Sequence, residues 1–416
     1  MHNVKAAESG ASIVVTPETR QAALQGTPLM MRLAATIADK LRYGTLTLQL
    51  PDGRRLVFRG QEECEHAATI NIKNYRFAWG VLLKGDIGFY ESFADGDWDT
   101  PDLTAVLYIF ARNADHIQKS YEAAPVLKWI ENIRSALDRN TRVGAKRNIM
   151  AHYDLGNEFY EKWLDRTMTY SSARFAGPSN DLADAQRNKY KTLAQSIDLR
   201  PDDSVLEIGS GWGGFAEFAA KDVGARVTGL TISKAQYDYA RERIFREGLA
   251  EKVEIRLQDY RDVGGAYDKV ASIEMFEAVG KQYWPAYFSK VRDCLKPGGA
   301  AGLQIITIAD RFFDHYLSSP DFIQRYVFPG GMLPSPEALK NHVSKANLAW
   351  RDAQSFGLDY ARTLEEWHAR FLDAWEEIAS MGFNDGFKKL WRYYLSYCEA
   401  GFRARTIDVM QVAVTR

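Results

Sequence analysis

Cysteine is scarce in this sequence of 416 residues: Cys64, Cys294 and Cys398 lie far apart, and none belongs to a Cys-X-X-Cys pair. This spacing argues against a disulfide framework and against a metal site, and it is typical of proteins in a reducing cytoplasm. Long hydrophobic runs are missing too, since no stretch approaches the roughly 18 apolar residues of a membrane span. The N-terminal residues lack the basic-then-apolar order of a secretory signal. We therefore expect a cytoplasmic protein without a metal ion.

Neither sign of charge is in excess, because 53 Lys and Arg residues are matched by 54 Asp and Glu residues. This near-neutral balance argues against a general nucleic-acid-binding protein. Aromatic residues, by contrast, make up 12% of the chain, and such side chains usually fill a core. At roughly 100–200 residues per domain, the length predicts two or three domains.

The first part of the chain predicts three regions. Residues 1–27 have few large hydrophobic side chains, and we interpret them as a mobile tail. Alternating apolar and polar residues on both sides of a Pro-Asp-Gly turn at residues 51–53 predict a β-hairpin, which belongs to a small α+β domain over residues 28–113. Residues 114–150 predict a basic helical linker. Its Lys and Arg residues form either a solvated helix face or a patch for anionic lipid headgroups.

Residues 151–416 predict an α/β domain, because from Asp203 onward short apolar segments alternate with helical patterns. This alternation is typical of a parallel sheet covered by helices on both faces. Two aromatic-rich helical segments, 311–345 and 363–402, are expected to close over the carboxyl edge of that sheet. The predicted strands are Ser204–Ile208, Arg226–Leu230, Val253–Leu257, Lys269–Ile273 and Ala300–Ile306, with Asp408–Val414 as a returning edge strand.

A nucleotide-type site is predicted where the first of these strands ends. Glu207 lies inside the end of this strand, where a carboxylate can meet a cationic ligand. The glycines Gly209 and Gly211 follow between the strand and a helix, where a ligand can approach the backbone closely. The second strand ends in Leu230-Thr231 without the acidic residue that usually binds the ribose of NAD. Asp259 and Tyr260 follow the third strand and suit an adenine amino group and ring. These features favour S-adenosylmethionine, with a flavodoxin-like or NAD-binding fold as the alternative.

Nine segments between about residue 150 and the C-terminus carry a more specific pattern. They are His152–Asp165, Met168–Phe175, Leu206–Gly214, Gly229–Gln236, Leu257–Asp262, Met275–Gly280, Tyr326–Ser335, Phe356–Leu364 and Phe402–Asp408. In these segments, and in their order, the chain resembles the cyclopropane-fatty-acid synthase family, which includes the mycolic-acid methyltransferases. The resemblance implies a class I, Rossmann-like S-adenosylmethionine methyltransferase domain with helical insertions. For the N-terminal domain it implies, more loosely, lipid engagement and self-association.

The resemblance also implies contacts to S-adenosylmethionine, although each of these residues also has a structural interpretation. Tyr170 and Ser171 would close over the methionine end, and Gly209 and Gly211 would form the floor. Thr231 and Gln236 would reach the ribose region. Asp259 and Tyr260 would hold the adenine.

In this family the substrate is the cis double bond of a phospholipid acyl chain. Attack of the double bond on the sulfonium methyl leaves a carbocation, which aromatic faces can stabilise before a base removes a proton. Four aromatic residues are candidates for the wall of this site: Tyr316, Phe328, Tyr360 and Trp367.

In ring-forming members the resemblance implies a bound bicarbonate as the base, held by Cys, Glu, His and Tyr side chains and by a backbone group. Here Glu277, Tyr360 and the backbone of Ile306 keep their positions, whereas Ser172 replaces the Cys and Gln304 replaces the His. The His that usually follows the Glu is also absent, because residue 278 is Ala.

Several explanations of these replacements stay open. Ser and Gln still offer hydrogen bonds, so a working bicarbonate site is one explanation. A changed deprotonation that gives a methyl or methylene branch is another, and loss of activity is a third. Glu277 could itself be the base, with its pKa raised by an apolar tunnel.

The leading hypothesis is an enzyme that uses S-adenosylmethionine to add one carbon to an unsaturated acyl chain of a membrane phospholipid. We expect peripheral binding to the anionic inner face of the membrane, and a homodimer. The alternatives are a soluble methyltransferase for a small amine or hydroxyl compound, and a lipid-binding module without catalysis.

Overall fold

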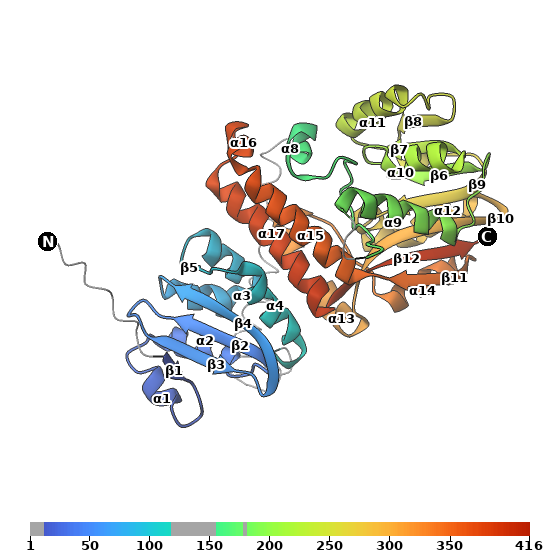
Figure 1. The fold of residues 1–416 in the computed structure, drawn as a ribbon. Coiled ribbons are helices and arrows are strands. Elements are labelled where there is room, and N and C mark those ends of the chain that lie inside the picture. Colours follow the sequence, from blue (N-terminus) through green and yellow to red (C-terminus); the bar gives the residue numbers. More distant parts are fainter. Residues whose placement is uncertain (1–11, 118–154, 178–180) are drawn as a thin grey trace. The chain divides into compact units, whose positions relative to one another are not determined.

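A computed structural model describes residues 12–117, 155–177 and 181–416, apart from the side chains of residues 63 and 64. The chain forms two compact units, which are described separately (Figure 1). Unit 1 contains Met1–Asn148 and Asn384–Ala404, and unit 2 contains Ile149–Phe383 and Arg405–Arg416. The basic residues of the predicted linker, between 128 and 147, lie outside the described residues.

Unit 1 is built on a five-stranded sheet in the order β1-β3-β2-β4-β5. Its strands are β1 (Ser12–Val14), β2 (Tyr43–Gln49), β3 (Arg55–Arg59), β4 (Glu62–Ile72) and β5 (Trp98–Asp99). Strands β2 and β3 are antiparallel around the Pro-Asp-Gly turn, with Leu46 opposite Phe58, so the predicted hairpin is confirmed. Both of these side chains are buried, as expected for the apolar face of alternating strands.

Five helices complete the described part of unit 1: α1 (Arg20–Ala23), α2 (Leu29–Ala38), α3 (Arg76–Ala94), α4 (Leu103–Arg112) and α17 (Asp385–Ala404). The N-cap of helix α4 is Asp102, whose side chain accepts a hydrogen bond from the N–H of Ala105 at 2.8 Å. This carboxylate satisfies an N–H group that has no partner within the helix.

The described part of the predicted tail is ordered structure, so that part of the prediction is wrong. Ser12–Val14 pair with β3 in parallel, with Ile13 opposite Leu56. Ala23 and Leu24 are buried in the unit 1 core. A three-residue edge strand and a one-turn helix are too short to give a periodic sequence signal, so the sequence does not distinguish them from a tail.

Helix α17 also differs from the prediction, because it belongs to unit 1 and not to the unit that contains the parallel strands. It packs beside α3 and α4 (Figure 1). The ring of Tyr393 lies 5.0 Å from that of Tyr90 and 5.8 Å from that of Phe93. The Nζ of Lys389 donates to the backbone oxygen of Ala94 at 2.8 Å. The expected continuous region 151–416 is therefore interrupted by this helix.

Unit 2 is a seven-stranded sheet in the order β11-β12-β10-β9-β6-β7-β8. The strands are β6 (Ser204–Ile208), β7 (Arg226–Thr231), β8 (Val253–Leu257), β9 (Tyr267–Ile273), β10 (Leu295–Ile308), β11 (Ala349–Ser355) and β12 (Ile407–Thr415). Each of the five predicted parallel strands is confirmed. Strand β12 is antiparallel to both β10 and β11, so it is an interior strand, and the prediction of an edge strand is wrong.

Helices cover both faces of this sheet. Leu206 and Val205 are neighbours on β6 but belong to two different buried clusters, as expected for residues that point to opposite faces. The first cluster includes side chains from α12 (Trp284–Cys294) and α14 (Pro336–Lys345). The second includes side chains from α9 (Leu182–Ser196), α10 (Gly214–Phe218), the π-helix η1 (Ala219–Val223) and α11 (Lys234–Arg246).

Unit 2 contains further helical segments. They are α8 (Gly156–Trp163), η2 (Tyr260–Asp262), η3 (Phe276–Ala278), η4 (Lys281–Tyr283), α13 (Asp310–Ser318), the π-helix η5 (Ile323–Val327), α15 (Gly357–Asp373) and α16 (Trp375–Ser380). Within the described residues, no helix is long and apolar enough to cross a membrane.

Candidate functional site

The glycine-rich loop follows β6, as predicted, and its backbone is fixed by β7. The N–H groups of Gly209 and Ser210 donate to the backbone oxygen of Leu230 at 3.0 and 2.7 Å. Gly209 has a φ of +82°, and a Cβ there would lie 2.7 Å from the Cγ of Met275. Gly211 has a φ of +52°, and a Cβ there would meet no heavy atom within 4 Å. The loop therefore needs glycine at Gly209, and it leaves open space at Gly211.

Glu207 lies just before this loop and is buried. The N–H of Ala216 donates to its carboxylate, while its Oε2 is enclosed and has no hydrogen-bond partner among the described residues. Burial raises the pKa of Glu207 well above its usual value, and the charge of Arg243 opposes this shift. An enclosed carboxylate oxygen without a partner fits a cationic ligand such as S-adenosylmethionine.

The ends of β7 and β8 carry the remaining predicted cofactor residues. The hydroxyl of Thr231 donates to the Oε1 of Gln236 at 2.8 Å, so these two predicted residues meet. Asp259 is held by Arg261, whose Nε and Nη2 donate to its two carboxylate oxygens at 2.9 and 2.6 Å. This pairing lowers the pKa of Asp259, which therefore remains an ionised acceptor. The side chain of Leu230 is buried in the core, and its backbone oxygen accepts the two hydrogen bonds from the glycine loop.

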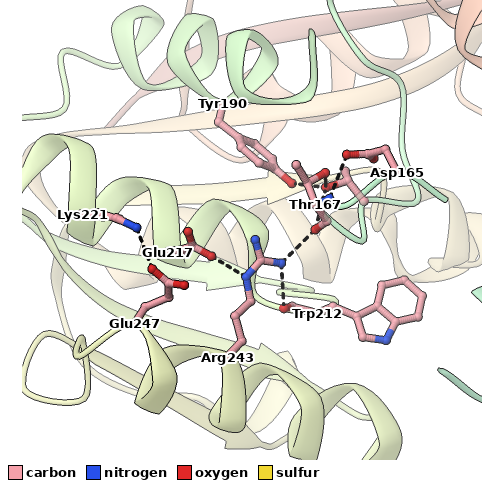
Figure 2. A network of polar contacts seen from close by, with 9 residues as sticks. Asp165, Thr167, Tyr190, Trp212, Glu217, Lys221, Arg243 and Glu247 are labelled. Carbon is pink, nitrogen blue, oxygen red and sulfur yellow. Dashed lines mark hydrogen bonds and ion pairs between the residues drawn. The ribbon is translucent and has the colours of Figure 1, made fainter. Parts of the chain in front are cut away.

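A polar network behind the glycine loop was not predicted (Figure 2). Arg243 of α11 pairs with Glu217 of α10 at 2.5 Å, and both side chains are only 12% exposed. The same guanidinium donates to the backbone oxygens of Thr167 at 2.8 Å and Trp212 at 3.4 Å. Figure 2 shows that Arg243 thus joins α11 and α10 to the glycine loop and to the segment before Tyr170.

Tyr170 and Ser171 extend from that segment. The ring of Tyr170 lies 5.2 Å from that of Tyr160 and 5.4 Å from that of Trp367. The Oγ of Ser171 accepts a hydrogen bond from the Nζ of Lys189 at 2.6 Å. Lys189 is fully buried in α9, and this burial lowers its pKa to about 7.

Glu277 is hydrogen-bonded to the backbone of Ile306, although the resemblance implied that both would contact a bicarbonate ion. Its Oε1 accepts from the N–H of Ile306 at 2.5 Å, whereas its Oε2 is enclosed and has no hydrogen-bond partner among the described residues. Burial, and then the neighbouring charge of Glu274, raise the pKa of Glu277 to about 8. A carboxylate of this kind can accept a proton.

Glu274 was not predicted from the sequence. Its carboxylate accepts hydrogen bonds from the other three predicted catalytic residues, Ser172, Gln304 and Tyr360. Its Oε1 accepts from the N–H of Ser172 at 2.8 Å and from the Nε2 of Gln304 at 2.7 Å. Its Oε2 accepts from the hydroxyl of Tyr360 at 2.7 Å. A signal was present, because Glu274 is the first residue after β9, where carboxyl ends of parallel strands form sites.

Residues 140–412 match the profile of the family described as mycolic acid cyclopropane synthetase. The chain belongs to this family. It is 39% identical to the tuberculostearic acid methyltransferase UfaA1 of Mycobacterium tuberculosis, over 80% of this chain and 79% of that protein. It is 37% identical to the cyclopropane-fatty-acyl-phospholipid synthase of Escherichia coli, over 84% and 88% of the two chains.

Solved structures of the mycolic acid cyclopropane synthetase family agree with this assignment. The cyclopropane synthase MmaA2 of M. tuberculosis matches with a TM-score of 0.60 and 28% identity, covering 65% of this chain and 97% of that one. The mycolic acid cyclopropane synthase CmaA1, complexed with S-adenosylhomocysteine, gives the same values. The protein is therefore an S-adenosylmethionine-dependent methyltransferase of a lipid-modifying family with a class I fold.

Bicarbonate, which the family resemblance implies for ring-forming members, does not fit the donors found here. The donors of Ser172, Gln304 and Tyr360 are directed at the carboxylate of Glu274. The hydroxyl of Ser172 donates instead to the backbone oxygen of Ala173 at 2.8 Å. The Oε1 of Gln304 accepts from the Nε2 of Gln411 at 3.1 Å.

The four predicted wall residues have different surroundings. Trp367 is fully buried, and its ring lies edge-on to that of Tyr360 at 6.1 Å. The hydroxyl of Tyr316 accepts from the N–H of Leu333 at 3.2 Å, and its pKa is raised mainly by burial, with a smaller contribution from Glu277. Phe328 is 41% exposed. Tyr316 and Tyr360 each interact with a carboxylate of the site, Tyr316 with the charge of Glu277 and Tyr360 through its hydrogen bond to Glu274.

Proposed function

We propose that this protein transfers one carbon from S-adenosylmethionine to the cis double bond of an unsaturated acyl chain in a membrane phospholipid. We further propose that the product keeps a double bond, as a methyl-branched alkene or a methylene branch, and is not a cyclopropane ring. The observation that carries this proposal is the enclosed Oε2 of Glu277, which is next to a second carboxylate and has no hydrogen-bond partner among the described residues.

The chemistry requires a proton acceptor in an apolar site. S-adenosylmethionine supplies a methyl group, to which the alkene π electrons form a carbon–carbon bond as the carbon–sulfur bond breaks. The acyl chain is then a carbocation and must lose a proton to become neutral. We assign this proton to the Oε2 of Glu277, because a carboxylate with a raised pKa is a matched acceptor near neutral pH.

Binding of the cofactor is assigned to the residues at the carboxyl ends of β6, β7 and β8. The unpartnered Oε2 of Glu207 supports recognition of a cationic group, and the space at Gly211 supports close approach to the backbone. Tyr170, Ser171, Thr231, Gln236, Asp259 and Tyr260 keep the roles that the family resemblance implies for them.

A branched product is supported by the replacements at Ser172 and Gln304. Ring closure and a methylene group both require loss of a proton from the newly added methyl group. The donors that would hold a bicarbonate base are used by protein groups here, which supports the methyl branch in particular. The identity of 39% to a tuberculostearic acid methyltransferase supports the same product. Ring formation is the second candidate, favoured by 37% identity to a cyclopropane-fatty-acyl-phospholipid synthase.

The substrate also requires reversible contact with a membrane. We propose that the protein docks on the anionic cytoplasmic face as a homodimer and draws one acyl chain into the site. Basic residues combined with apolar contacts supply two weak signals that add together, and two copies increase avidity.

The test uses S-adenosylmethionine with a trideuterated methyl group and vesicles of cis-unsaturated phospholipid, followed by mass analysis of the released fatty acids. Retention of three deuterons identifies an intact methyl branch. Retention of two identifies a methylene group or a ring, which catalytic hydrogenation separates. A ring overturns the proposed product. Absence of label in lipid, together with transfer to a small polar acceptor, overturns the proposed substrate.

A further inference from the structure

The donors that would hold bicarbonate are directed at a carboxylate of the chain itself. We propose that Glu274 takes the place of bicarbonate in this protein, so that the enzyme works without that anion. This inference rests on the proposed one-carbon transfer, but it does not depend on whether the product is branched or cyclic.

The first support is the identity of the donors. The N–H of Ser172, the Nε2 of Gln304 and the hydroxyl of Tyr360 lie 2.8, 2.7 and 2.7 Å from the oxygens of Glu274. These residues stand at three of the positions assigned to bicarbonate binding. Both oxygens of one carboxylate are thereby engaged, as the oxygens of a bound planar anion would be.

The second support is the backbone of Glu274, which has a φ of +49°. This left-handed conformation is costly for residues other than Gly, Asn and Asp, and such strain concentrates at functional sites. The N–H of Glu274 donates to the backbone oxygen of Gln304 at 2.8 Å, which holds the residue at the end of β9. Glu274 therefore has a backbone conformation that glycine would adopt with less strain.

The third support is the arrangement of charge. Glu274 interacts with the buried Lys189 as an opposite charge and with Glu277 as a like charge. Burial raises the pKa of Glu274, and Lys189 and the three donors oppose this shift by favouring the ionised form. When Glu274 is ionised, its charge makes Glu277 more basic.

These observations divide the roles of bicarbonate between two residues. Glu274 supplies the anion that occupies the donors, and acts on the reaction through Glu277 as a positioning residue. Glu277 accepts the proton at Oε2: the carbon–hydrogen bond of the cation breaks, its electron pair neutralises the cation, and an oxygen–hydrogen bond forms. The proton then passes to solvent before the next turnover.

The test begins with turnover of the full-length protein in buffer freed of carbon dioxide and in the same buffer with added bicarbonate. Wild-type turnover is expected to be equal in the two buffers. Glu274→Gly removes the carboxylate and relieves the backbone, and we expect turnover to fall about 100-fold in the depleted buffer. Added bicarbonate or formate should then restore most of the loss, because the space and the donors remain.

Two variants serve as controls. Glu274→Gln fills the same space without the charge, so neither anion should restore its turnover. Asp202→Gly relieves a positive φ of 65° at an exposed residue outside the site, and it should behave like the wild type. Wild-type turnover that depends on bicarbonate overturns the inference, as does a folded Glu274→Gly variant that neither anion restores.

A binding readout separates this inference from the proposed function. The melting temperature is measured with and without formate for the wild type, Glu274→Gly and Glu274→Gln. A rise confined to Glu274→Gly supports the inference even if no lipid is modified. Equal shifts in the three proteins overturn it, whatever the substrate proves to be.

Discussion

Replacing Glu277 by Gln should make the stability of the protein less dependent on pH. The pKa of Glu277 is raised from its usual 4.5 to about 8, mainly by burial. The folded protein therefore binds this proton more tightly than the unfolded chain does, and stability falls as the pH rises between these two values. At 1.36 kcal/mol per pH unit, the difference between the two pKa values corresponds to at most roughly 5 kcal/mol of unfolding free energy.

The assay is urea unfolding of the wild type and Glu277→Gln at about pH 5 and about pH 8.5. We expect the two proteins to differ little at the lower pH, because Glu277 is protonated there and resembles Gln. At the higher pH the variant should be more stable by several kcal/mol, since the wild type must hold a charge in an enclosed site. Glu251→Gln, at an exposed position, should follow the wild type at both values.

The raised pKa of Glu277 also predicts how the activity depends on pH. At pH 7 about one tenth of Glu277 is ionised, so wild-type kcat/KM should rise about tenfold as the pH increases through 8. Glu277→Gln should lose at least about 100-fold of its turnover. Parallel stability curves for wild type and variant, or a flat pH–rate profile, would refute the assignment of Glu277 as an enclosed proton acceptor.

Three further substitutions test other parts of the structure. Gly209→Ala places a Cβ 2.7 Å from the Cγ of Met275 and should cost about 2 kcal/mol, measured by calorimetry as a roughly thirtyfold weaker affinity for S-adenosylmethionine. Arg243→Met breaks the pair with Glu217 and should lower the free energy of unfolding by roughly 3 kcal/mol, whereas an unchanged urea midpoint would contradict the role of this network. Tyr393→Ala should destabilise unit 1 by roughly 4 kcal/mol in the same assay, because this buried ring packs on α3.

The sequence predicted the parallel strands of unit 2 and the glycine loop because their signals are local. Each strand is a short apolar run, and the loop is a cluster of glycines between a strand and a helix. Whether β12 is an interior or an edge strand depends on its neighbour β11, whose sequence gives little indication of a strand. Strand β11 is mostly exposed, so its residues do not alternate as those of a half-buried strand would.

Glu274 was missed for a different reason. Its neighbour Glu277 matched the family pattern, whereas the function of Glu274 depends on donors at Ser172, Gln304 and Tyr360, far away in the sequence. Likewise, the apolar face of α17 can be predicted from the sequence, but the surface that this face covers cannot. Hydrophobic periodicity shows which face of a helix or strand is buried, but it does not show which other element packs against that face.

Helix α17 has a consequence for synthesis on the ribosome. Unit 1 begins to emerge first, yet it is complete only when Asp385–Ala404 has been made, after the 235 residues from Ile149 to Phe383. At about 5–20 residues per second this interval lasts roughly 10–50 s. During that time the surfaces of α3 and α4 that α17 later covers remain open to solvent or to chaperones. The nascent chain therefore carries an exposed apolar surface while the first segment of unit 2 is translated.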